Sequence, residues 1–193
     1  MSFLTKARLE LNAQLAKEAK LQVDQEFRQS FLKIKNKMIA DFLAHPVTKE
    51  LEDGVNASNI SGTLGGVTNL FSFIGFEKGD DPIGPILDLL MQTDYRLTGT
   101  GTRRVNFLVD LPEPKDIFLV TPLPFQSGRS WAKGIESGIS GLNYFLGKQS
   151  QSSRSGFGIQ SDKKVRNGVK FRNTKYITAL LKEYQRKFAS ITL

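Results

Sequence analysis

The stretch LTKARLELNAQLAKEAKLQVDQEFRQSFLKIKNKMIADFLAHP (residues 4–46) governs the architecture that we expect for this chain. Apolar side chains recur in it every three or four residues, which is typical of one face of a helix. No Gly or Pro occurs before Pro46. We predict one helix of about 40 residues, about 60 Å long at 1.5 Å per residue, that ends at His45-Pro46. The apolar stripe comprises Leu4, Ala7, Leu11, Leu15, Ala19, Val23, Phe27, Phe31, Ile34, Met38 and Phe42.

Such a helix is longer than a globule of 193 residues is wide. Part of it is therefore expected to pack on something outside its own domain. An interruption between Gln22 and Gln25 is left open, and the alternative is a helical hairpin that folds back on itself. His45 is expected to cap the carboxyl end of the helix, where it would interact with the helix dipole.

The rest of the chain alternates extended and helical patterns. The apolar segment 69–76 predicts a strand or a buried extended piece. Asp80 or Asp81 is expected to cap a helix that begins with a proline in its first turn. Clean alternation over 103–111 predicts a half-buried strand, and 117–121 predicts its antiparallel partner across a Pro-Glu-Pro link.

Helical spacing returns after these strands. It covers 130–146, where Gly134, Gly138 and Gly141 lie three to four residues apart, and it covers 176–188, a basic amphipathic helix. The predicted fold class is α+β, with a long N-terminal helix, a small antiparallel sheet, one or two packing helices and a C-terminal basic helix. The expected parts are an N-terminal helical arm (1–45), an α+β core (46–148), and a flexible loop with the basic helix (149–193).

The net charge of +8 is concentrated at the carboxyl end. Residues 163–193 hold nine Lys and Arg against Glu183, a charge of +8, so residues 1–162 sum to zero. Residues 46–94 hold two Lys against eight Asp and Glu, a charge of −6. The basic segment can therefore dock on the acidic segment of another copy, or it can bind nucleic acid. A solvated basic helix is the third interpretation.

The composition excludes several classes of site. No apolar run approaches the roughly 20 residues that a membrane span needs, and Met1-Ser2-Phe3 leads into charged residues, so we expect no membrane partner and no signal peptide. The chain has no Cys, and its one His is His45. Disulfides, thiolate nucleophiles, Cys-based zinc sites and two-histidine mechanisms are therefore excluded. We expect a soluble intracellular or virion-type protein that acts through its surfaces.

One motif fits an enzyme. Glu113-Pro114-Lys115 has the Glu-x-Lys spacing of restriction-type nucleases, in which Asp94 or Asp110 would complete a Mg²⁺ site. Because a proline between the two residues removes a strand donor, we expect this spacing to arise by chance in a turn. The basic tail, in which Phe157, Phe171 and Tyr176 are interleaved with Lys and Arg, allows non-specific contact with DNA.

The segment Trp131-Ala132-Lys133-Gly134-Ile135-Glu136-Ser137-Gly138 resembles the signature of the neck and tail-completion proteins of long-tailed bacteriophages. These proteins resemble one another in an N-terminal helix, a Thr-Gly-x-Leu-like stretch, a small antiparallel sheet, this Glu-x-Gly segment, a variable loop, and a final helix entered through an aromatic residue and an Arg. The counterparts here are the helix to Ala44, Gly62-Thr63-Leu64, the strands at 103–121, and Phe171-Arg172. The resemblance implies copies that assemble as a ring between head portal and tail tube, with DNA passing through the lumen.

The candidate interface combines this motif with the basic helix. Glu136 is expected to accept hydrogen bonds from backbone or Arg donors, and the neighbouring glycines are expected to allow a close backbone contact. The basic side chains are expected to steer docking on an acidic neighbour. The candidate interface residues are Trp131, Gly134, Glu136, Gly138, Phe171, Arg172, Lys182, Arg186 and Lys187.

We therefore expect a non-enzymatic structural virion protein with no catalytic residue, no cofactor and no metal. It would be a homo-oligomeric, ring-forming neck or tail-completion component, assembled in the host cytoplasm, that contacts other virion neck, portal or tail proteins. The alternative is a basic nucleic-acid-binding or metal-dependent nuclease-like protein. A ring subunit should associate irrespective of nucleic acid, whereas a DNA binder should lose affinity steeply with salt.

Overall fold

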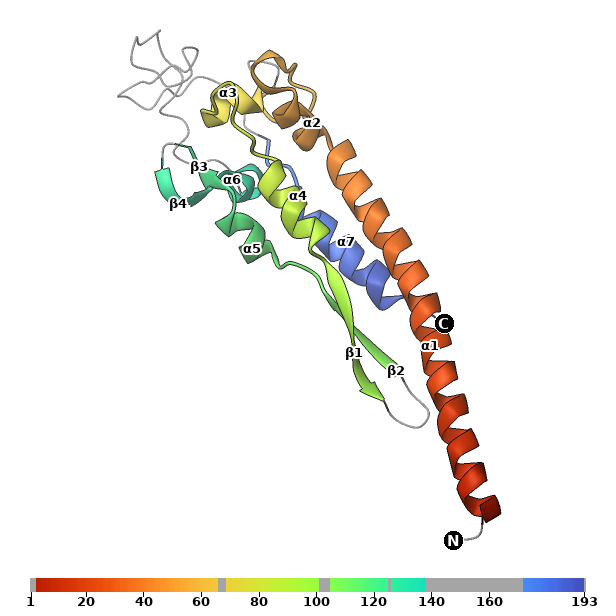
Figure 1. Cartoon of the computed structure of the whole chain (residues 1–193). Helices are drawn as coiled ribbons and strands as arrows, with labels where there is room; N and C mark the ends of the chain where they lie inside the picture. Colours follow the sequence, from red (N-terminus) through yellow and green to blue (C-terminus); the bar gives the residue numbers. More distant parts are fainter. Residues whose placement is uncertain (1–2, 66–68, 101–104, 125, 138–171, 193) are drawn as a thin grey trace, which may run out of the picture.

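A computed structural model describes residues 3–65, 69–100, 105–124, 126–137 and 172–192, and in them the predicted α+β class is confirmed (Figure 1). The strands form two antiparallel pairs, β1 with β2 and β3 with β4. The elements in chain order are α1 (Phe3–Ala44), α2 (Pro46–Glu52), the 3-10 helix η1 (Gly54–Asn56), α3 (Leu70–Ile74), α4 (Gly84–Met91), β1 (Asp94–Thr100), β2 (Val105–Asp110), α5 (Pro114–Leu119), β3 (Pro122–Leu123), β4 (Gln126–Ser130), α6 (Trp131–Ser137) and α7 (Ile177–Ala189).

Helix α1 is continuous over the whole predicted stripe. It passes Gln22 and Gln25 without a break, which rules out the helical hairpin. Its N-terminal part extends past the other elements of the described chain (Figure 1), and there Leu15 and Leu21 are 54% and 55% exposed. The C-terminal half of α1 is held by the body through side chains four and seven residues apart. These buried side chains are Phe27, Phe31, Met38 and Phe42.

The predicted role of His45 at the carboxyl end of the first helix is wrong. His45 has an extended backbone and is the N-cap of α2, where its Nδ1 accepts a hydrogen bond from the backbone N–H of Val47 at 3.2 Å. Pro46 is the first residue of α2, a position where a missing N–H is harmless. Burial lowers the pKa of His45, and the neutral ring is the form that can accept this bond.

The prediction of a strand at 69–76 is also wrong, because local capping outweighs the apolar pattern. The side chain of Asn69 accepts from the N–H of Ser72 at 2.9 Å, which starts α3. Gly75 ends the helix with a φ of 94°, a left-handed conformation that favours glycine. The Asn69 side chain also donates to the carbonyls of Val55 and Ala57, so this cap is tied to the preceding loop.

Segment 117–121 is not the predicted partner strand. Residues 114–119 form α5, because Glu113 and Asp116 make a capping box and Pro114 occupies the first helical position. The strand predicted at 103–111 is confirmed as β2, and its partner is β1, in a register that places Leu97 opposite Phe107. This hairpin packs on α1, where the Phe107 ring stacks on Phe27 with centroids 3.9 Å apart.

Helix α4 begins beside Asp81, as predicted. The Asp81 carboxylate accepts from the N–H groups of Ile83 and Gly84 at 3.1 and 2.8 Å. The other end of α4 is capped from α1, since Nζ of Lys35 donates to the carbonyls of Met91 and Thr93 at 2.6 and 2.7 Å. These two bonds fix the exit of α4 against the middle of α1.

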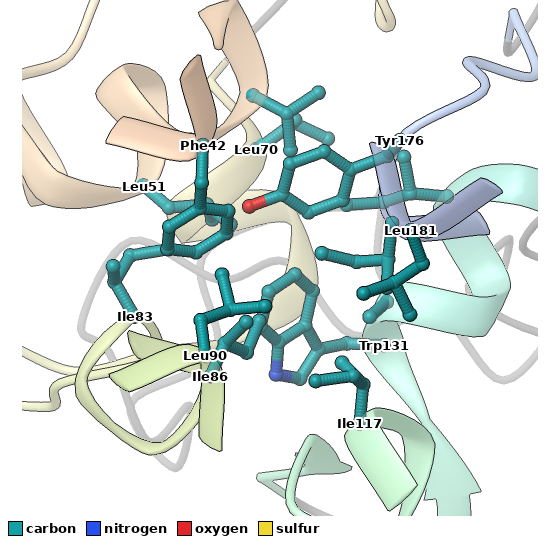
Figure 2. Close-up of a cluster of buried hydrophobic side chains, with 14 of the residues drawn as sticks. Phe42, Leu51, Leu70, Ile83, Ile86, Leu90, Ile117, Trp131, Tyr176 and Leu181 are labelled. Carbon is teal, nitrogen blue, oxygen red and sulfur yellow. The ribbon is translucent and has the colours of Figure 1, made fainter. Parts of the chain in front are cut away.

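The predicted C-terminal helix is confirmed as α7, and it completes the core instead of standing apart (Figures 1 and 2). Its side chains contact α1, where the rings of Phe31 and Phe188 lie 5.3 Å apart. The cluster in Figure 2 draws on helices from both ends of the chain. It includes Phe42, Leu51, Leu70, Ile83, Ile86, Leu90, Ile117, Trp131, Tyr176 and Leu181.

Candidate functional site

The first candidate residue, Trp131, is a core residue in this chain. Only 1% of its surface is exposed, and its ring meets Phe76 edge-on with centroids 6.0 Å apart. Figure 2 shows the indole within the central cluster. Its backbone N–H donates to the carbonyl of Thr121 at 2.9 Å, which joins the start of α6 to the end of α5. Trp131 therefore positions α6, and its ring is not offered to a partner.

The Glu136 side chain accepts hydrogen bonds from backbone donors, and these donors belong to the same chain. One carboxylate oxygen accepts from the N–H of Thr178 at 2.7 Å and from the N–H of Tyr176 at 3.3 Å. The other oxygen accepts from the Thr178 hydroxyl at 2.8 Å. These donors lie at the N-terminus of α7, where the helix dipole also favours a negative charge. Glu136 thus joins α6 to α7.

The backbone around this junction is close-packed. Gly134 is half-buried in α6, and the N–H of Thr174 donates to the carbonyl of Ile135 at 3.1 Å. The N–H of Arg172 donates to the carbonyl of Thr63 at 2.9 Å, while the Arg172 side chain is exposed. The segment that leads into α7 therefore lies against the backbone of α6 at Ile135, next to Gly134. Gly138 and Phe171 lie outside the described residues.

The Tyr176 side chain holds the start of α7 against the rest of the chain. Its ring is buried between Phe42 and His45, with centroid separations of 6.1 and 4.7 Å, and its hydroxyl lies 2.7 Å from Oγ1 of Thr48. Burial raises the pKa of Tyr176, so the hydroxyl stays protonated. Tyr176, the residue directly before α7, is thus fixed to α1 and α2.

The basic candidates lie on the outer side of α7. Lys182 and Arg186 are exposed, whereas Lys187 is half-buried. Nζ of Lys187 pairs with Glu183 at 2.6 Å and lies 4.2 Å from the centroid of the Tyr184 ring. The apolar stripe of α7 is buried in its own chain. Only the charged side of α7 is available to a partner.

A polar network joins the inner side of α7 to α1. The hydroxyl of Tyr184 donates to Asp41, whose other oxygen pairs with Lys37. Hydrogen bonds from Lys37 and Tyr184 hold the pKa of Asp41 below its usual range. Burial and the hydrogen bond to Asp41 raise the pKa of Tyr184 to about 12. The network therefore consists of a carboxylate and a neutral phenol at neutral pH.

One member of the acidic segment does not reach the surface. Glu50 is fully buried, and its two oxygens accept from the N–H groups of Leu70 at 2.7 Å and Ser61 at 2.9 Å. It holds the loop between α2 and α3. This role cannot be predicted from the sequence, because the segment Val-Thr-Lys-Glu-Leu around Glu50 looks like part of an ordinary short helix. The acidic surface is accordingly smaller than the −6 count suggests.

The nuclease geometry does not form at the Glu-x-Lys spacing. Glu113 and Lys115 pair at 2.7 Å on the surface at the start of α5, whereas that site requires both on one strand. Asp110 lies opposite Asp94 in the hairpin and pairs with Arg96 at 3.6 Å. Within the described ranges, no group of three or more His, Cys, Asp or Glu is arranged to hold a metal ion.

Two grooves along α1 were not predicted. The first, here called the α1–β1 groove, is a hollow of about 650 Å³ between α1, the end of α4 and β1. The second, of about 540 Å³, lies between α1, β2 and the end of α7. Both depend on the hairpin lying against α1, a contact between residues far apart in the sequence. The α1–β1 groove is lined by Asp24, Arg28, Leu32, Met91, Asp94 and Leu97, among others.

None of the helices in the described part of the chain combines the length and the apolar character needed to span a membrane. Comparison of the chain with protein-family models, with curated proteins and with solved structures finds no match.

Proposed function

We propose that this chain is a structural subunit of a tailed-bacteriophage particle: a non-enzymatic, ring-forming neck or tail-completion component that joins the head connector to the tail. The observation that carries the proposal is the projection of α1 beyond the body, with Leu15 and Leu21 more than half exposed (Figure 1). Apolar side chains on a projecting helix favour association, because burying them removes apolar surface from water.

The residues that carry the resemblance to the phage family have a structural role in this chain. The segment in α6 that carries the resemblance combines a buried Trp131 with Glu136, which secures the N-terminus of α7. A subunit of this kind has a rigid body built from its first and last helices, and it presents an arm at one end. Rigid bodies with arms suit closed assemblies, since a fixed angle between neighbours lets a ring close.

Electron microscopy of the purified full-length chain tests the proposal. We expect closed rings of uniform diameter, formed in the absence of DNA and retained after nuclease treatment. A chain that stays monomeric at all concentrations, and that binds DNA with an affinity that falls steeply with salt, would favour the nucleic-acid-binding alternative. Lys182 and Arg186, which are exposed on α7, are among the described basic residues available for such binding.

A further inference from the structure

The one histidine of the chain lies at a corner where three helices meet. His45 follows the last residue of α1 and is the N-cap of α2. Its half-buried ring lies with its centroid 4.7 Å from that of Tyr176, the residue directly before α7. A change in the state of this ring therefore acts on α1, on α2 and on the start of α7 together.

The contact that His45 makes with α2 requires a neutral ring. Its Nδ1 accepts a hydrogen bond from the backbone N–H of Val47 at 3.2 Å, so this nitrogen carries no proton. A charged imidazole has an N–H at both nitrogens, and two N–H groups cannot bond to each other. Proton uptake therefore removes the side-chain cap of α2. A helix of seven residues has little stability of its own and depends on its cap and its packing.

The first turn of α2 in turn holds the start of α7. Thr48 is the third residue of α2, and its Oγ1 lies 2.7 Å from the hydroxyl of Tyr176. Thr48 and Tyr176 are 0% and 2% exposed, and the Tyr176 ring lies in the central cluster with Phe42 (Figure 2). Because both hydroxyls are buried, water does not replace their bond if the turn shifts. Loss of the cap is thus transmitted to Tyr176.

Charged side chains occur on each element around this corner. Burial raises the pKa of Tyr176, and the carboxylates of Glu52 and Glu136 raise it further. The pKa of His45 nevertheless lies below its ordinary value because the ring is buried, so no carboxylate of the described residues offsets that burial. The charged side chains concerned are Asp41 of α1, Lys49 and Glu52 of α2, Glu136 of α6, and Lys175 directly before Tyr176.

We propose that this corner is a proton-sensitive joint, in which proton uptake by His45 releases the first turn of α2 and loosens the start of α7 from α1. Glu136 still holds the N-terminus of α7 from the side of α6, so acid loosens one of two attachments and does not detach the helix. The joint lies within a single chain. It therefore acts with or without assembly, and it does not depend on the proposed function.

Proton NMR of the full-length chain measures the titration directly, because one histidine gives one set of ring signals. We expect a pKa below 6.5, the ordinary value. The unfolded chain then binds more protons than the folded chain, so this contribution to stability is complete above pH 6.5 and is lost as the pH falls through the folded value. A measured pKa at or above 6.5 would show that the carboxyl end of α1, which attracts a charged ring, outweighs burial, and would overturn the inference.

Hydrogen exchange followed by mass spectrometry locates the change. Rates at about pH 7.5 and about pH 5 are compared after correction for the intrinsic effect of pH, and we expect residues 46–52 and 176–180 to exchange at least roughly threefold faster at the lower pH. Helix α4 is attached to α1 through Lys35 and not through His45, so its rate should not change. Equal corrected rates at both pH values in the two segments would contradict the joint.

Two variants separate the His45 ring from other titrating groups. His45→Asn puts a good capping side chain in place of the ring and cannot titrate, so the effect of pH on residues 46–52 should vanish. Asp41→Asn is the matched control, because the pKa of this α1 carboxyl lies below its usual range and far from this pH interval; the effect should persist in it. If His45→Asn responds to pH as wild type does, or Asp41→Asn does not respond, another group is the sensor and the inference is wrong. Should His45→Asn not fold, the NMR titration and the exchange of the wild-type chain decide.

Discussion

Replacing Glu136 by alanine removes the acceptor of three hydrogen bonds at the start of α7. Loss of a capping acceptor costs about 0.5–2 kcal/mol. The helix dipole adds about 0.3–1 kcal/mol for a negative charge at this end. Because Glu136 is half-buried, water can replace part of what is lost, and we expect about 2 kcal/mol in the free energy of unfolding. For a chain of this size that lowers the melting temperature by about 4–8 °C.

Thermal melting followed by circular dichroism measures this effect. Glu136→Gln keeps an oxygen acceptor and loses the charge, so its melting temperature should lie between those of wild type and Glu136→Ala. Glu183→Ala is the control, because this exposed glutamate pairs only along the surface of α7. If Glu136→Ala melts with wild type, the carboxylate does not secure α7, and the argument that α6 and α7 are joined through it is wrong.

Three further predictions concern α1 and α7. The pKa of Asp41 is depressed in the folded chain, so its contribution to stability is complete above about pH 4 and is lost as the pH falls through the folded value; Asp41→Asn should flatten this part of a pH–stability curve measured by urea unfolding. Deleting residues 1–24 should leave a folded chain that no longer assembles, and complete unfolding by circular dichroism would place this segment in the core instead. Reversing Lys182, Arg186 and Lys187 to Glu should weaken self-association in a salt-dependent way in sedimentation, without changing retention on DNA; lost DNA binding with normal assembly would favour the alternative function.

The two helices that build the frame were predictable because their patterns are long. α1 has a stripe without Gly or Pro, and α7 has four buried residues at helical spacing. Two short elements, α3 and α5, were predicted with the wrong conformation, since in five or six residues an apolar run fits either a helix or a strand. For α3 and α5 the choice was made by caps: Asn69 with Gly75 in the first, and Glu113 with Asp116 in the second. Weighing such caps before apolar content would have corrected both.

Strand β1 was missed for a different reason. Its sequence, Asp-Tyr-Arg-Leu-Thr-Gly-Thr, lacks apolar alternation, and Leu97 at its middle is exposed. It is a strand because β2 pairs with it and because the Tyr95 ring packs on Phe27, 4.8 Å between centroids. Pairing and packing of this kind involve partners far away in the chain. The α1–β1 groove follows from the same contact, so no local pattern could predict it.

The candidate site was predictable only at the level of single side chains. The need of Glu136 for backbone donors follows from its chemistry, but its donors at Tyr176 and Thr178 lie 40 and 42 residues away. Trp131 was expected at an interface and is buried, because a large aromatic residue signals either environment. Burial of Glu50 depends on two backbone donors that only the folded loop brings to it.

Because α1 is one unbroken helix clamped by the body over its second half, its free end behaves mechanically as a lever. A flexible tether would let the tip of the arm sample many directions while the body stayed still. Here the orientation of the body sets the direction in which the free end of α1 points, because Phe27 and Phe31 are buried where the helix meets the body. The 21 residues of α1 that precede Asp24 span about 32 Å, so a body rotation of about 10° displaces the tip of the helix by about 5.5 Å. That displacement is about one helical turn, enough to move a leucine from one hollow of a neighbouring surface to the next.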